Sequence, residues 1–232
     1  MTTPDATPSM SARSEAVGSL SNEHVQDALL RERYRQWAPS YDGAFASYSE
    51  RTLQEAVEAL GTPLPRHILD LGCGTGLLVQ RLTRSDPAVH VTGVDFSEDM
   101  LQKARSHLSE QGCVRFIHGR ADQIPAASRS FDAVVVANAF HLIRHGPAAL
   151  SECRRVLRPG GSLVIVDWCR DFVPMRLFAW GLLLTQRLRR RIISMDAQQR
   201  MLANAGFRVT DARRFRARPV WGLMRVTARL ES

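Results

Sequence analysis

Strand-like and helix-like segments alternate along most of this chain, and this alternation limits the folds available to it. The strand-like runs are short and apolar and span residues 67–71, 90–94, 114–118, 131–137 and 163–168. Helical stretches lie between most of them, at residues 77–83, 98–108 and 147–157. Strands that alternate with helices are typical of a parallel sheet covered on both faces. The pattern therefore predicts an α/β fold.

The two ends of the chain depart from this alternation. Two further strand-like runs, at residues 207–215 and 223–230, are joined by a short link that contains a proline, which predicts an antiparallel pair. Near the other end, helices are expected at residues 24–37 and 50–60, before the first strand. The sheet is therefore expected to be mostly parallel, with an antiparallel strand at the end of the chain.

The length of 232 residues is that of one domain. Residues 1–22 are rich in Ser, Thr, Ala and Pro, and we expect a disordered tail there. The remaining residues, 23–232, are expected to form the domain, with a helical cap over 23–61 and a lid-like insertion over 171–195. The insertion is apolar in its first half and rich in arginine in its second.

Charge and cysteine content restrict the compartment and the partners. The formal net charge is +8, and the arginines are concentrated in the C-terminal third. This basicity would attract nucleic acids, anionic lipids or acidic metabolites, but a solvated basic face is the simpler interpretation. The four cysteines have neither CxxC spacing nor the density of a disulfide scaffold. We therefore expect a reduced, cytoplasmic protein without a structural metal.

A glycine loop follows the first predicted strand and opens a helix. It reads Asp70-Leu-Gly-Cys-Gly-Thr-Gly76, and glycines in this place let the backbone pass close to a ligand. Asp95 stands at the end of the second strand, where a carboxylate can reach a ribose hydroxyl pair. The loop is shorter than GxGxxG and is preceded by an acid. It therefore suits a nucleoside that carries no pyrophosphate but has a charged amino-acid end.

With these residues in place, the sequence resembles the class I S-adenosylmethionine (SAM) dependent methyltransferases that act on small molecules, related to the ubiquinone and menaquinone C-methyltransferases. The resemblance covers roughly residues 30 to 230. Its motifs are WAPSYD (37–42), ILDLGCGTG (68–76), VTGVDFS (91–97), GRADQIP (119–125), FDAVVVANAFH (131–141) and VLRPGG (156–161). The resemblance implies a Rossmann-like, seven-stranded sheet with an antiparallel last strand, and SAM as cofactor.

The resemblance also implies roles for individual residues. Asp70 and the loop would face the methionine part of SAM, Asp95 its ribose hydroxyls and Phe96 its adenine ring. The expected cofactor-binding residues are Tyr34, Tyr41, Asp70, Gly72, Cys73, Gly74, Gly76, Asp95, Phe96, Ala121, Asp122 and Asn138. Simpler interpretations exist, since Asp70 could cap the following helix and the tyrosines could be packing residues.

Methyl transfer from a sulfonium depends mainly on alignment, and a base helps when the acceptor is a hydroxyl or an acidic carbon. His141, just beyond the fourth strand, is the candidate base, although a histidine there can also serve only to hydrogen-bond the backbone. Large apolar residues in the lid-like segment, among them Phe178 and Trp180, suggest an apolar or aromatic acceptor. The same segment could instead rest on an anionic membrane that holds a lipid or quinone acceptor.

Three other functions are possible. A nicotinamide-dependent oxidoreductase would share the strand, loop and acid, but it would show the longer glycine spacing. A nucleic-acid methyltransferase would explain the charge, but residues 138–141 lack the Pro-Pro-aromatic pattern that grips a flipped base. A cofactor-binding protein that has lost the reaction is the third. We therefore expect a small-molecule acceptor and no nucleic-acid partner, with the oligomeric state open.

Overall fold

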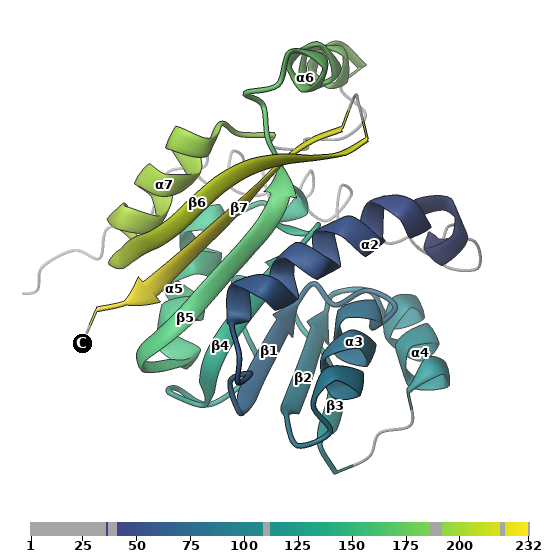
Figure 1. Ribbon diagram of the computed structural model, residues 1–232, viewed down its shortest axis with the longest axis vertical. Coiled ribbons are helices and arrows are strands. Elements are labelled where there is room, and N and C mark those ends of the chain that lie inside the picture. Colours follow the sequence, from purple (N-terminus) through teal and green to yellow (C-terminus); the bar gives the residue numbers. More distant parts are fainter. Residues whose placement is uncertain (1–35, 37–40, 109–111, 186–191, 219–220, 232) are drawn as a thin grey trace, which may run out of the picture.

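The computed structural model describes residue 36 and residues 41–108, 112–185, 192–218 and 221–231. Seven strands form one sheet in the order β3-β2-β1-β4-β5-β7-β6 (Figure 1). The first five strands pair in parallel, and β7 runs antiparallel to both β5 and β6. The strands are β1 (His67–Leu71), β2 (His90–Asp95), β3 (Val114–His118), β4 (Phe131–Ala137), β5 (Leu157–Trp168), β6 (Phe207–Arg218) and β7 (Trp221–Leu230). The predicted Rossmann-like sheet with an antiparallel last strand is confirmed.

Helices cover both faces of this sheet. In Figure 1, α2 and α3 pass in front of the strands and α5 lies behind them. The helices are α2 (Tyr41–Leu60), α3 (Leu77–Ser85), α4 (Glu98–His107), α5 (Gly146–Val156), α6 (Val173–Thr185) and α7 (Met195–Asn204), with a short 3-10 turn, η1, at Phe140–Leu142. The parallel crossovers from β1 to β2, β2 to β3 and β4 to β5 contain α3, α4 and α5 respectively, as is usual for parallel pairs.

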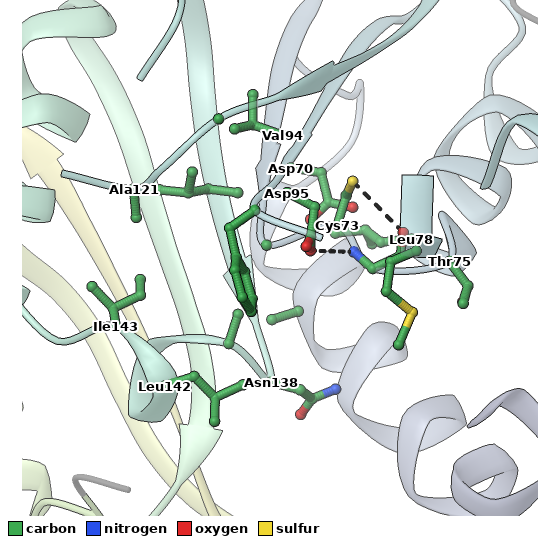
Figure 2. Close-up of a pocket in the computed structure, with 18 of the residues that line it drawn as sticks. Asp70, Cys73, Thr75, Leu78, Val94, Asp95, Ala121, Asn138, Leu142 and Ile143 are labelled. Carbon is green, nitrogen blue, oxygen red and sulfur yellow. Dashed lines mark hydrogen bonds between the residues drawn. The ribbon is translucent and has the colours of Figure 1, made fainter. Parts of the chain in front are cut away.

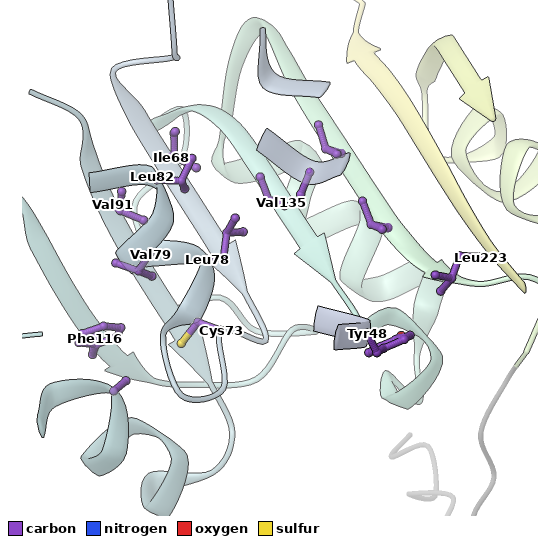
Figure 3. Close-up of a cluster of buried hydrophobic side chains, with 14 of the residues drawn as sticks. Tyr48, Ile68, Cys73, Leu78, Val79, Leu82, Val91, Phe116, Val135 and Leu223 are labelled. Atoms are coloured by element: carbon purple, nitrogen blue, oxygen red, sulfur yellow. The ribbon is translucent and has the colours of Figure 1, made fainter. Parts of the chain in front are cut away.

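The hydrophobic core forms two layers because successive strand residues point to opposite faces. Ile68 belongs to the cluster beneath α2 and α3, together with Leu78 and Leu82 of α3 (Figure 3). The next residue, Leu69, belongs to the cluster on the other face, with Leu150 of α5. Buried on both faces, the central strands are mostly apolar, which is the pattern that predicts them from the sequence.

Ion pairs to the buried Glu55 carboxylate join helix α2 to β6 and β7 at one edge of the sheet. The Glu55 side chain has no exposed surface, and its carboxylate pairs with Arg51 on α2, Arg213 on β6 and Arg225 on β7. Arg225 also binds Asp211 at 2.7 Å. A buried carboxylate with several guanidinium partners fixes the direction in which α2 crosses the sheet. The amino-terminal half of α2 is thereby placed over the carboxyl ends of β4 and β5.

Two elements differ from their predicted bounds by more than a few residues, and one helix was not predicted. Helix α2 begins at Tyr41, nine residues before the predicted start, and β5 begins at Leu157 because that residue pairs with Phe131 across a bulge. Helix α7 was not predicted, although Ser194 caps it by accepting a hydrogen bond from the backbone N–H of Ala197 at 3.2 Å. The predicted tail over 1–22 and the predicted helix at 24–37 fall on residues that, apart from residue 36, lie outside the described ones.

Candidate active site

A cleft of ≈ 1220 Å³, measured with its mouth to solvent, opens at the carboxyl ends of the central strands (Figure 2). The chain runs outward from β1 through β2 to β3 and then returns to β4 on the other side of β1, so the strand order reverses between β1 and β4. This is the position at which open α/β sheets bind ligands. The residues that line the cleft come from α2, from the ends of β1, β2 and β4, and from the loops that follow them. They are Ser49, Leu53, Asp70, Leu71, Gly72, Cys73, Gly74, Thr75, Leu77, Leu78, Val94, Asp95, Phe96, Met100, Gly119, Arg120, Ala121, Asp122, Ala137, Asn138, Ala139, Leu142, Ile143 and Arg144.

The glycine loop forms one wall, and two of its glycines have distinct reasons to be glycine. Gly72 has φ +80°, and a Cβ atom there would lie 2.5 Å from the Cβ of Ala139 across the cleft. Gly76 also has φ +80° and begins α3, where a Cβ atom would meet Ala104 at 3.1 Å and Phe116 at 3.2 Å. Gly72 therefore keeps the cleft open, whereas Gly76 serves the packing of α3 against its neighbours.

Asp95 is held in place by backbone donors. Its carboxylate accepts hydrogen bonds from the N–H of Gly74 and from the N–H of Ser97, both at 2.9 Å. Burial raises the pKa of Asp95 above its usual range, and these N–H donors oppose that rise. The loop and the second strand thus fix the orientation of the carboxylate before any ligand arrives.

Asp70 has a different environment, although it lies in the same wall. It is 2% exposed, and its Oδ2 atom has no hydrogen-bond partner among the described residues. Burial, and then the nearby charge of Asp95, raise the pKa of Asp70 to about 8. A buried oxygen without a partner costs free energy, so this wall is prepared for a cation or a donor that the folded chain itself does not supply. Asp70 does not cap α3, which has no side-chain cap.

The opposite end of the cleft contains an ion pair and an aromatic ring. Asp122 accepts two hydrogen bonds from the Arg120 guanidinium, at 2.9 and 3.1 Å. These bonds lower the pKa of Asp122, so the carboxylate stays charged at neutral pH. Phe96 follows Asp95 directly and contributes its ring to the wall. This end therefore offers a flat apolar surface with a polar edge.

Asn138 joins the cleft to α2. It has φ +58°, a left-handed conformation that asparagine tolerates better than most residues. Its side-chain oxygen accepts a hydrogen bond from the Tyr48 hydroxyl at 2.7 Å, and its amide donates to Thr52 at 2.8 Å. The Tyr48 hydroxyl in turn accepts from the indole N–H of Trp168 at 2.6 Å. The ends of β4 and β5 are thus tied to one turn of α2.

His141 is buried beside this network, and its ring is turned away from the cleft-lining residues. Its Nδ1 lies 2.7 Å from Oδ1 of Asp167, and its backbone N–H donates to the other carboxylate oxygen at 2.7 Å. The imidazole stacks on Trp168 with 4.2 Å between ring centroids and an interplanar angle of 11°. Because Asp167 occupies Nδ1, Nε2 is the ring nitrogen that an acceptor could meet.

Comparison with known proteins identifies the family. A methyltransferase domain model matches residues 68–161. The chain is 33% identical over 186 residues to an O-methyltransferase of Pyrenophora dematioidea, covering 76% of this chain and 67% of that protein. It is 35% identical over 158 residues to a demethylmenaquinone methyltransferase of Thermus thermophilus, covering 64% of this chain and 68% of that protein. The chain belongs to the class I SAM-dependent methyltransferases. It is thus an enzyme of this type, with SAM as its cofactor.

The structural comparison agrees with this methyltransferase fold. Human N-acetylserotonin methyltransferase, solved in complex with SAM, matches with a TM-score of 0.66 and 17% identity, covering 87% of this chain and 57% of the human one. At that identity the likeness supports the fold alone. None of the described helices is long and apolar enough to cross a membrane.

The predicted site residues of this methyltransferase are only partly brought together. Those that line the cleft are Asp70, Gly72, Cys73, Gly74, Asp95, Phe96, Ala121, Asp122 and Asn138. Gly76 packs beneath the loop, Tyr34 lies outside the described residues, and Tyr41 is described only as the first residue of α2. Sequence reasoning missed Ser49, Leu53, Arg144 and Asp167. Only Asp167 had a local signal, as an acid near the end of an apolar strand.

Proposed function

We propose that this enzyme transfers the methyl group of SAM to a small apolar or aromatic acceptor of the phenol or quinone class. One observation carries the proposal: two buried carboxylates stand in the wall of a cleft that is otherwise largely apolar. Such a cleft suits a cationic cofactor beside an acceptor without charge. The names of the two relatives, an O-methyltransferase and a demethylmenaquinone methyltransferase, support this acceptor class.

The residues present fit SAM, because Asp70 supplies a buried oxygen that lacks a partner and SAM carries positive charge at its amino and sulfonium groups. We assign Asp70, Gly72 and Asn138 to the methionine part and Asp95 to the ribose hydroxyls. Phe96 would contact the adenine face. Ala121 and Asp122 would meet the adenine amino group. Cys73, Gly74 and Gly76 would contribute through the backbone of the loop, and Tyr34 and Tyr41 would cover the cofactor.

When bound, SAM supplies an electrophilic methyl group on a sulfonium. The chain's own contribution is to align the acceptor with that methyl group and to exclude water, an effect worth up to roughly 7–11 kcal/mol. Apolar side chains of α2 and of the turn after β4, such as Leu53 and Leu142, line the cleft where an acceptor would lie. His141 does not line the cleft, so it would act as the base only for an acceptor that reaches past the lining to Nε2 of its ring, and Asp167 would hold that ring in position.

Methyl transfer can be tested directly. Enzyme and methyl-labelled SAM would be incubated with a phenol, a hydroxynaphthoquinone and a polar aliphatic alcohol, and labelled products would be identified by mass spectrometry. We expect label on an aromatic acceptor. Asp95→Ala should sharply lower transfer at limiting SAM, whereas Asp196→Ala, at an exposed position on α7, should not. Transfer to the aliphatic alcohol alone would contradict the acceptor class.

The base is tested separately, by replacing His141. His141→Ala should lower kcat for a hydroxyl acceptor roughly 10²–10⁴-fold while SAM affinity stays within a few-fold. Asp167→Asn should lower kcat less than His141→Ala does and leave SAM affinity within a few-fold, because Asp167 acts through the imidazole. An unchanged kcat in His141→Ala would leave the histidine a packing residue between Trp168 and Asp167.

A second acceptor class is a lipid or quinone methylated at a bilayer surface. The observation that favours it is the exposed apolar surface of α6, which bears on docking and is treated next. The two acceptor classes differ in whether the acceptor is dissolved or held in a bilayer. Both would be methylated by SAM in the same cleft.

A further inference from the structure

Helix α6 carries apolar side chains on two sides, and the protein covers only one of them. On the inner side Met175 is 1% exposed, and the ring of Phe178 packs near two tryptophans of the sheet. On the outer side Val173, Leu177 and Trp180 are 64%, 68% and 69% exposed. Spaced four and three residues apart, they form one row, here called the α6 stripe. Among the described residues, these three and Phe178 are the only exposed large hydrophobic side chains.

Positive charge surrounds the start of this helix. Arg170 and Arg176 are exposed, and the guanidinium of Arg216 lies 5.1 Å from the centre of the phenyl ring that precedes α6. The acid in this stretch, Asp171, is neutralised by Arg214 at 2.6 Å. Arg170, Arg176 and Arg216 therefore leave a net positive charge beside the α6 stripe. The arginines at 187 and 189–191 lie outside the described residues, and nothing here depends on them.

We propose that α6 docks this enzyme on the surface of an anionic lipid bilayer. The α6 stripe would enter the interfacial layer, where tryptophan is a favoured anchor, and the arginines would meet the anionic headgroups. With 13 residues, α6 is about 20 Å long, less than the ~30 Å hydrocarbon thickness, so it would lie in the plane of the surface. A second copy of the chain fits poorly, because it would bring the same arginines against these.

Docking through α6 would place the bilayer surface close to the proposed base. Figure 1 shows α6 at the end of the molecule toward which the arrowhead of β5 points. Its inner residue Phe178 lies with its ring 5.6 Å from that of Trp168, and Trp168 stacks on His141. The helix that meets the bilayer is thus next to the proposed base. Docking itself does not depend on the acceptor or on methyl transfer.

The test measures binding of the full-length protein to sucrose-loaded vesicles by sedimentation. Vesicles of phosphatidylcholine alone are compared with vesicles in which a third of the lipid is phosphatidylglycerol, at low and at high salt. We expect binding to the anionic vesicles, and the double variant Leu177→Gln, Trp180→Gln should bind them at least tenfold more weakly. Arg176→Gln should weaken binding about fivefold at low salt. The matched control Arg115→Gln, exposed on β3 at the other edge of the sheet, should bind as the parent does.

Three results would overturn the proposal. The parent protein could fail to bind either kind of vesicle. The double variant could bind as tightly as the parent, which would show that net charge alone, and not the α6 stripe, accounts for vesicle binding. Alternatively, sedimentation equilibrium could show a dimer that the double variant dissociates, which would make the α6 stripe an interface between copies. Circular dichroism and SAM titration on each variant show that it is folded and cofactor-competent. Vesicle binding without methyl transfer would contradict the proposed function and leave the docking intact.

Discussion

Replacing Asp70 by Asn should remove a pH dependence from the stability of the cofactor-free protein. In the folded chain the pKa of Asp70 is about 8, because the carboxyl is buried and lies near Asp95, whereas its ordinary value is 3.8. The folded state therefore holds a proton on Asp70 that the unfolded state releases above pH ~4. A group with a raised folded-state pKa stabilises fully below the unfolded value, and this contribution disappears as pH rises through the folded value. Asp70 should thus lower stability progressively between pH ~4 and ~8.

The expected change in stability follows from the difference between the folded and unfolded pKa values of Asp70. Each pH unit between the two pKa values changes the free energy of unfolding by about 1.4 kcal/mol, so Asp70 should lose roughly 2–3 kcal/mol of stability between pH 5 and pH 7. Urea unfolding of the parent and of Asp70→Asn at pH 5, 6 and 7 would measure this. Other titrating groups contribute to both proteins and cancel in the difference. The two curves should converge at low pH and separate as pH rises, with the variant the more stable.

Saturating SAM supplies the decisive comparison. If a cationic cofactor meets the Asp70 carboxylate, it favours the ionised form, so the pH dependence of the parent should flatten when SAM is present. The variant should gain less stability from SAM than the parent does, because its affinity is lower. Parallel stability curves for the two cofactor-free proteins would refute the reasoning about burial. A separation that SAM leaves unchanged would refute the assignment of Asp70 to the cofactor.

Three further outcomes are expected. Asp95→Ala should weaken SAM binding in calorimetry by roughly 1.5–3 kcal/mol, the range for a hydrogen bond to a charged group, and unchanged affinity would remove Asp95 from the site. Glu55→Gln should lower the urea-measured free energy of unfolding by up to about 3–5 kcal/mol, because it removes the buried carboxylate that three guanidinium groups share, that of Arg225 nearly buried, whereas Glu58→Gln on the same helix should cost less than about 1 kcal/mol. Phe178→Ala should lower the melting temperature while Trp180→Ala leaves it nearly unchanged, since only Phe178 packs against the sheet; equal losses would contradict this division of α6.

The sheet could be predicted because its signals are local. Strand β4, Phe131–Ala137, was predicted with its observed bounds, since a strand buried on both faces is a continuous apolar run. Helix α7 was not predicted despite Ser194 at its start and Gly206, with φ +81°, beyond its end, because residues 196–206, between the predicted insertion and the last strands, were assigned no element. The early start of β5 depends on Leu157 pairing with another strand, which no local pattern reveals.

In the candidate site too, some residues could be predicted from local sequence signals and others depend on tertiary contacts. The loop after β1 and the acid after β2 were predicted because strand ends meet at one edge of a parallel sheet. The bond between Tyr48 and Asn138 joins residues 90 positions apart, and Asp167 meets His141 across 26 positions. These contacts follow from how α2 crosses the sheet and from the pairing of β4 with β5. Sequence spacing alone could therefore name His141 but not the carboxylate that holds it.

The turn at Asn138 separates the wall of the cleft that would hold the cofactor from the proposed base, His141. The left-handed φ of Asn138 turns the chain as β4 ends, so that Ala139 and Leu142 face the cleft, while His141 between them turns toward Trp168. The cofactor side thus keeps two carboxylates without an imidazole to neutralise them, and the imidazole keeps its own carboxylate, Asp167. The turn at Asn138 therefore keeps the imidazole away from the wall that carries Asp70 and Asp95 and places it against Asp167 and Trp168.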